Sequence, residues 1–103
     1  MKTPENKKLI KKANTIVDLI SQAYSQINPT TAIGELYHTN VYYQNIGASE
    51  ELGEMEYTFD NEENVPESYY IDTLQNLEDT LTYCKSVLKM QQIESKMGDP
   101  IFG

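Results

Sequence analysis

The chain of 103 residues has room for one domain with a modest core, and we expect a single helical domain over residues 1–103. It carries 16 acidic and 8 basic residues, for a formal net charge of −8, and its one cysteine excludes an intramolecular disulfide framework. No apolar run approaches the roughly 18 residues of a membrane span, and none follows the lysine-rich start. We therefore expect no secretory signal, no membrane association and a cytoplasmic location.

The positive charges are confined to the two ends of the chain. All eight are lysines, five within residues 1–12 and three within residues 85–103, so residues 13–84 hold thirteen carboxylates and no positive side chain. Binding to a phosphate backbone needs a basic face, and base recognition relies on arginine, which this chain lacks. We therefore expect no direct binding to nucleic acid.

The first predicted element is a helix over about residues 4–27. Thr3 supplies an N-cap and Pro4 a proline at the first helical position, whereas Pro29 stops the helix. Apolar residues recur at alternating spacings of four and three, which is a heptad-like seam: Leu9, Ala13, Ile16, Ile20, Ala23 and Ile27. We expect this seam to face the core.

The middle of the chain is harder to assign. A helix over about residues 31–45, with its C-cap at Gly47, places four apolar residues on one face: Ile33, Leu36, Tyr37 and Val41. For residues 50–59 two alternatives stay open. One is a short helix capped by Ser49, and the other is an extended ribbon in which apolar and polar residues alternate, with Met55, Tyr57 and Phe59 on one side.

The last predicted element is a helix from about residue 65 to about residue 96. Asn64 and Glu67 have the spacing of a capping box, and Gly98 and Pro100 end the helix before a short flexible tail at residues 98–103. A second heptad-like seam consists of Tyr70, Leu74, Leu77, Leu81, Cys84 and Leu88, and we expect Ile71, Val87 and Met90 to broaden its face.

Two long helices with matching seams predict a mainly α fold. We expect a small helical bundle built on two long antiparallel terminal helices, with a shorter helix and an acidic loop or ribbon between them. If the chain covers these seams incompletely, self-association into a homo-oligomer such as a homodimer would complete the burial.

Tests for catalytic and metal sites give no candidate. An EF-hand loop that begins at Asp60 would need glycine and glutamate where the chain has Val65 and Ile71. A structural zinc site needs four nitrogen or sulfur ligands, and the chain has one histidine and one cysteine, His38 and Cys84. We expect Cys84 to be a buried core residue and His38 to lie at a helix surface or against an aromatic ring. No enzyme activity, metal or cofactor is expected.

The most distinctive segment is acidic. Residues 47–67 hold eight carboxylates and no basic residue, and tyrosines accompany them. Such a surface suits binding to a basic protein, with aromatic anchors and polar rims, although solubility alone would also account for it. The predicted partner-binding residues are Glu50, Glu51, Glu54, Glu56, Tyr57, Asp60, Glu62, Glu63 and Glu67.

Two functions follow as hypotheses. The first is a non-enzymatic interaction module, a small acidic inhibitor or adaptor that binds a basic surface of a partner protein, such as a nucleic-acid-binding channel, by mimicking the charge of nucleic acid. The small size and lysine-, asparagine- and isoleucine-rich composition suit a viral or mobile-element protein. The alternative is a structural or chaperone-like helical subunit that assembles through its heptad seams.

Overall fold

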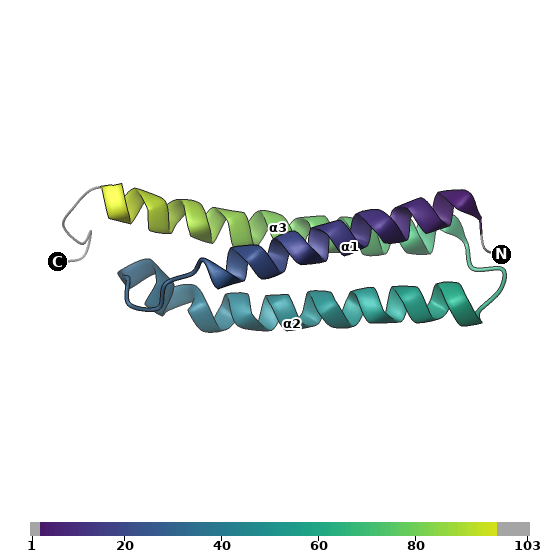
Figure 1. The fold of residues 1–103 in the computed structure, drawn as a ribbon, viewed down its shortest axis with the longest axis horizontal. Helices are drawn as coiled ribbons and strands as arrows, with labels where there is room; N and C mark the ends of the chain where they lie inside the picture. Colours follow the sequence, from purple (N-terminus) through teal and green to yellow (C-terminus); the bar gives the residue numbers. More distant parts are fainter. Residues whose placement is uncertain (1–2, 97–103) are drawn as a thin grey trace.

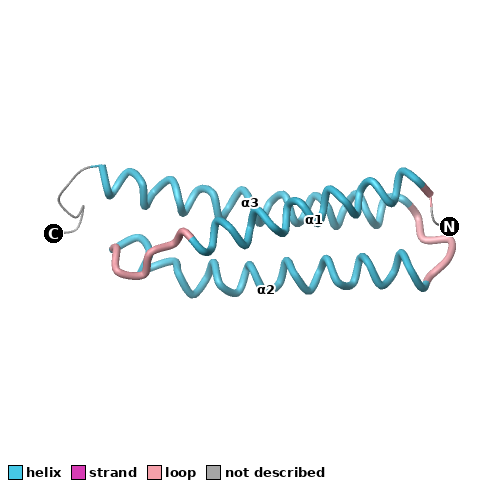
Figure 2. Tube along the Cα trace, viewed as in Figure 1, coloured by secondary structure: helices cyan, strands magenta, loops and turns pink. Residues whose placement is uncertain are grey.

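The computed structural model describes residues 3–96, whose helices form a three-helix bundle (Figure 1). α1 spans Pro4–Ser25, α2 spans Ala32–Asn61 and α3 spans Glu67–Lys96, and no strand occurs between residues 3 and 96 (Figure 2). The predictions of a mainly α fold and of a helical bundle are confirmed. The predicted helix end at Gly98 and Pro100 and the tail at residues 98–103 lie outside the described residues.

The two terminal helices pack against each other, but they run parallel, so the predicted antiparallel pairing is wrong. Near the C-terminal ends of α1 and α3, the backbone amide of Asn28 donates to Gln91 Oε1 over 2.8 Å, and Gln91 Nε2 donates to the backbone carbonyl of Gln26 over 3.0 Å. The physical reason is the length of α2, which has 30 residues, as α3 does. Because α2 carries the chain back along the rod, α3 begins at the same end as α1 (Figure 1).

α1 begins where the sequence predicts. Thr3 is extended, its Oγ1 accepts a hydrogen bond of 3.1 Å from the Asn6 amide, and Pro4 follows at the first helical position. The buried residues of the helix are Asn6, Ile10, Ala13, Val17, Ile20 and Ala23. The predicted seam members Leu9 and Ile16 are only half-buried, because α1 contacts both other helices and its apolar face is wider than the seam of a helix pair.

α2 is one continuous helix, which resolves the alternatives for the middle segment. It passes through Gly47, so the predicted C-cap there is wrong. Residues 50–59 are helical, so the ribbon is wrong, but they continue α2, so the separate short helix capped by Ser49 is wrong as well. Val41, Ala48 and Met55 recur at intervals of seven and are buried. Leu36, which was expected on the same face as Val41, is 67% exposed because it lies on the solvent side of the helix.

α3 begins two residues later than predicted, at Glu67. Asn64 has a φ of 62°, a left-handed conformation that asparagine tolerates but an N-cap does not use, so it forms the turn instead of a capping box. The buried apolar residues of α3 are Tyr70, Leu74, Leu77, Cys84 and Val87. Leu81 and Leu88 are half-buried at the edge of the core, and Ile71 is 48% exposed instead of broadening the seam.

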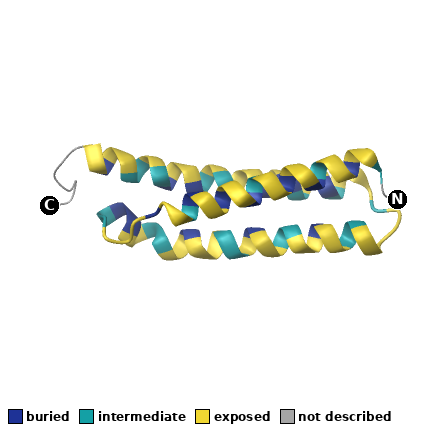
Figure 3. Cartoon of the chain, viewed as in Figure 1, coloured by how far each residue is buried: buried dark blue, intermediate teal, exposed yellow. Residues whose placement is uncertain are grey.

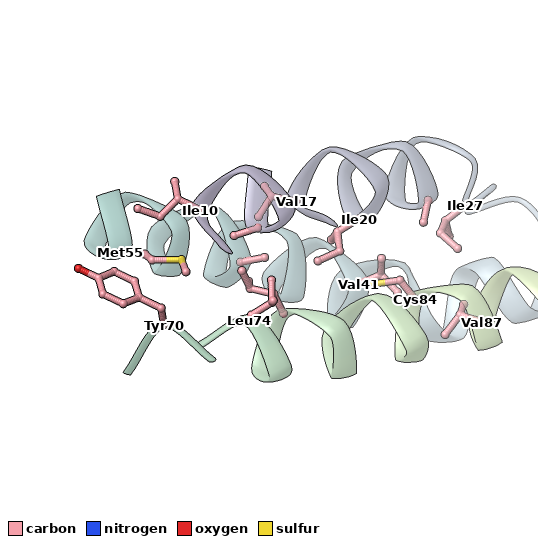
Figure 4. Packing of buried hydrophobic residues seen from close by; sticks show 14 of the residues in the cluster. Ile10, Val17, Ile20, Ile27, Val41, Met55, Tyr70, Leu74, Cys84 and Val87 are labelled. Atoms are coloured by element: carbon pink, nitrogen blue, oxygen red, sulfur yellow. The ribbon is translucent and has the colours of Figure 1, made fainter. Parts of the chain in front are cut away.

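All three helices contribute to one core. Buried residues lie on the inner sides of the helices (Figure 3), and a single cluster extends from Met55 and Tyr70 near one end of the rod to Ile27 and Val87 near the other (Figure 4). Each fully buried side chain of this size contributes about 1.5–3 kcal/mol. Cys84 lies in this core, as expected. Among the described residues, no helix is long and apolar enough to cross a membrane.

Glu94 joins α3 to the start of α2. Its carboxylate is buried and accepts hydrogen bonds from the amides of Ala32 (2.9 Å) and Ile33 (3.0 Å), while Thr31 Oγ1 accepts from the Gly34 amide (2.9 Å). The first backbone amides of a helix have no hydrogen-bond partner within the helix, and they carry partial positive charge. A carboxylate at this position accepts their hydrogen bonds and balances that charge. This contact fixes the end of the bundle opposite the acidic segment.

Candidate functional site

The predicted partner-binding residues lie at one end of the rod, where α2 passes into α3. Glu50, Glu51, Glu54, Glu56, Tyr57 and Asp60 are on α2, Glu62 and Glu63 are in the turn, and Glu67 is the first residue of α3. All are exposed except Glu51, which is half-buried. Because successive residues of a helix point in different directions, these side chains do not form one continuous surface.

Part of the set lines a groove between α2 and α3, which we call the acidic groove. Its lining residues are Gly53, Glu54, Tyr57, Thr58, Glu62 and Tyr69. Glu54, Thr58 and Glu62 follow one another at intervals of four, which places them on the same side of α2 and its C-cap. None of the described residues that line the groove is positively charged.

Two features shape the acidic groove. Gly53 leaves it open, because a Cβ built at this position would have no atom within 4 Å. On the opposite wall, the Tyr69 hydroxyl lies 3.5 Å from Thr58 Oγ1 and joins α3 to α2. Tyr57, with 64% of its surface exposed, stands at the rim. The groove therefore presents two carboxylates, two phenol rings and a hydroxyl around a position without a side chain.

The other side of α2 is different, because lysines accompany its acids. A second hollow, the lysine-flanked hollow, is lined by Lys7, Ile10, Lys11, Glu56, Phe59 and Asp60. Asn14 Nδ2 of α1 also donates to Glu56 Oε2 over 3.5 Å. The sequence did not suggest this proximity, since the lysines are about 50 residues away along the chain, and the antiparallel packing of α1 on α2 brings them to the same hollow. Glu56 and Asp60 thus differ from Glu54 and Glu62 in their surroundings.

The pKa shifts agree with uncompensated negative charge beside the acidic groove. Burial raises the pKa of the Glu51 carboxyl, and the nearby Glu54 carboxylate raises it further. Burial also raises the pKa of Tyr70, with additional effects from Tyr69 and from the Glu62 carboxylate. In both cases a carboxylate of the groove adds to the effect of burial on a neighbouring group.

The residues with catalytic or metal-binding potential are placed elsewhere. Cys84 is fully buried, and burial raises the pKa of its thiol, which disfavours the nucleophilic thiolate. His38 packs against Tyr24, with ring centroids 5.2 Å apart, in agreement with the predicted aromatic neighbour. Within residues 3–96, no group of three or more histidine, cysteine, aspartate or glutamate side chains is arranged to hold a metal ion.

Sequence reasoning missed Gly53, Thr58 and Tyr69 as members of the groove. The spacing of four between Glu54, Thr58 and Glu62 would have identified this face if residues 50–59 had been assigned to a helix. No sequence signal places Tyr69 opposite them, because that contact depends on the packing of α3.

Comparison of the chain with protein-family models, with curated proteins and with solved structures finds no match.

Proposed function

We propose that the chain is a non-enzymatic interaction module that uses the acidic groove to bind a basic surface of a partner protein. The observation that carries this proposal is the difference between the two sides of α2. Glu56 and Asp60 share a hollow with Lys7 and Lys11, whereas Glu54 and Glu62 face a groove whose described lining has no cation. A cationic group supplied by a partner would place positive charge in the acidic groove, as Lys7 and Lys11 place it in the lysine-flanked hollow.

The composition of the groove supports a protein partner. Interfaces favour tyrosine anchors accompanied by polar groups, and here Tyr57 and Tyr69 line the same groove as Glu54 and Glu62. The excess of negative charge over residues 13–84 attracts a basic protein from a distance and raises the rate of association. An inhibitor of this kind acts by occupying the basic channel that its partner otherwise uses for nucleic acid.

Two double variants test the proposal with matched charge. One changes Glu54 and Glu62 to glutamine in the acidic groove, and the other changes Glu56 to glutamine and Asp60 to asparagine in the lysine-flanked hollow. Each removes two negative charges from a formal net charge of −8. The wild-type chain is used to recover a partner, which is then purified and titrated with all three proteins.

We expect the Glu54/Glu62 variant to lose affinity for the partner and the Glu56/Asp60 variant to retain it. Wild-type binding should also weaken steeply as ionic strength rises. Equal loss in both variants would mean that net charge alone acts, and equal retention would mean that the acidic end takes no part in binding.

The alternative is a structural subunit that assembles with copies of itself or with other helices. The heptad seams are occupied within the bundle, so such an assembly would use another surface. The observation that favours it is a row of exposed apolar residues on α2, where Leu36 and Tyr43 are 67% and 65% exposed and are seven residues apart. Light scattering coupled to size-exclusion chromatography distinguishes the two functions, because an apolar assembly persists at high salt and an acidic complex does not.

A further inference from the structure

A third hollow lies between α1 and α2, away from the acidic groove, and its lining is aromatic. It is formed by Tyr24 of α1 and by His38, Thr39, Tyr42 and Tyr43 of α2, and has a volume of about 370 Å³. We call it the aromatic hollow. His38 and Tyr42 are four residues apart, as are Thr39 and Tyr43, so two adjacent rows of α2 side chains form one wall and Tyr24 forms the other.

The rings of the aromatic hollow are in contact and inclined to one another. The centroid of Tyr24 lies 5.2 Å from that of His38 and 5.7 Å from that of Tyr42, with interplanar angles of 48° and 49°. The ring centroids of Tyr42 and Tyr43 are 5.5 Å apart, and the two rings meet edge to face. Both of these tyrosines are open to solvent, at 42% and 65% exposure. A ligand in the hollow therefore meets ring faces that are set in different directions.

Charge indicates which ligand suits these rings. The electron-rich face of an aromatic ring attracts a cation, and Arg is found in such contacts more often than Lys because its planar guanidinium also stacks. All residues that line the hollow lie within residues 13–84, and this range contains no lysine or arginine that could occupy it. Exposed Glu35 lies one helical turn before Thr39 and adds negative charge on that side of α2.

We propose that the aromatic hollow binds an arginine side chain of the basic partner. The identity of the partner as a basic protein rests on the proposed function, but the hollow itself uses different residues. Ten residues separate Tyr43 from Gly53, a distance of about 15 Å along α2. An extended segment of about five residues covers that axial distance. The aromatic hollow lies between α1 and α2 and the acidic groove between α2 and α3, so a basic segment that engages both must also cross the exposed face of α2.

His38 provides a direct probe, because it is the only histidine of the chain and its imidazole proton signal needs no further assignment. The experiment titrates the protein at fixed pH with a nonapeptide of arginine and glycine, and with the same peptide in which uncharged citrulline replaces arginine. The variants are Tyr43→Phe, which retains the ring, Tyr43→Leu, which retains apolar bulk without a ring, and Ile93→Ser, a change at an exposed position of α3 outside both sites.

We expect a saturable shift of the His38 signal with the arginine peptide and none with the citrulline peptide. Tyr43→Phe and Ile93→Ser should bind the arginine peptide as the wild type does, and Tyr43→Leu should bind about fivefold more weakly, since a cation over a ring is worth roughly 1 kcal/mol. A His38 signal that does not move, an equal response to citrulline, or unchanged affinity in Tyr43→Leu would overturn the inference.

The same titration separates this inference from the proposed function. In the variant with Glu54 and Glu62 changed to glutamine, the His38 shift should persist at reduced affinity. If that variant binds as tightly as the wild type while His38 still responds, the acidic groove fails and the aromatic hollow stands. If the variant loses affinity while His38 never responds, the groove stands and the arginine site fails.

Discussion

The continuity of α2 through its glycines makes a quantitative prediction. Gly47 and Gly53 lie inside the helix, and a Cβ built at either position meets no atom within 4 Å. In a helix interior, glycine is about 1 kcal/mol less favourable than alanine, because it loses more backbone freedom on folding. Gly47→Ala and Gly53→Ala should each therefore stabilise the chain by about 1 kcal/mol.

The two gains should add, because six residues of helix separate the positions by about 9 Å and neither methyl touches the other. A total of about 2 kcal/mol corresponds to a rise in melting temperature of roughly 8–16 °C for a domain of this size. Gly34→Ala is the matched control of opposite sign. A Cβ there would overlap the backbone carbonyl of Asn28, and relieving such an overlap costs about 1–3 kcal/mol or more.

The assay is thermal and urea unfolding followed by circular dichroism, with all variants at the same protein concentration. The reasoning predicts stabilisation at positions 47 and 53 and destabilisation at position 34. If Gly53→Ala leaves stability unchanged or lowers it, residues around position 53 are not helical in solution, and the acidic groove as described does not exist.

Other changes follow from individual contacts. Glu94→Ala removes the carboxylate from the first amides of α2 and should lower the free energy of unfolding, measured in urea, by about 2 kcal/mol or more. The same change at exposed Glu78 should lower it by less than about 0.5 kcal/mol. Equal losses would show that Glu94 does not stabilise the start of α2. Folding raises the pKa of Glu51, so protonation of this carboxyl stabilises the native state. This stabilisation is present below about pH 4.5 and is lost as the pH rises through the raised pKa of the folded state. Glu51→Gln should therefore raise the melting temperature at pH 7 but not at pH 4, and an equal gain at both would contradict this cause. Cys84, buried and with a raised thiol pKa, should react with a disulfide reagent only after unfolding; rapid reaction of the native protein would show that the core opens there.

Much of the fold follows from local patterns in the sequence. Thr3 and Pro4 specify the start of α1, and the apolar periodicity of the first and last segments predicts two long helices. That periodicity does not reveal how many neighbours each helix has, so it could not separate Leu9 and Ile16 at the edge of the core from Ile10 and Val17 within it.

Whether α3 runs parallel or antiparallel to α1 depends on whether the middle segment forms one helix as long as the bundle. Gly47 and Gly53 lower the helix propensity of that segment, and a shorter helix followed by a ribbon was therefore a reasonable alternative. The heptad of Val41, Ala48 and Met55 was the signal for a full-length helix, and it becomes visible only when the segment is considered across both glycines.

The candidate site was predicted in part. The acidic residues are evident in the sequence, but the prediction grouped them into one surface. The sequence contains no information on which helix packs against which side of α2. The packing of α1 brings Lys7 and Lys11 to the same hollow as Glu56 and Asp60, and the packing of α3 brings Tyr69 to the same groove as Glu54 and Glu62. Contacts between segments so distant in sequence could not be derived from spacing alone.

The central claim is that the side of α2 without lysines binds cationic partners. Its most direct test is an amide NMR titration of the ¹⁵N-labelled chain with the arginine–glycine nonapeptide. We predict that shifts in the acidic end concentrate on residues 53–62 and Tyr69, vanish there when Glu54 and Glu62 are changed to glutamine, and persist when Glu56 and Asp60 are neutralised. Shifts of similar size at exposed acids outside the groove, such as Asp18 and Asp79, would show that the charge acts diffusely and would contradict the claim.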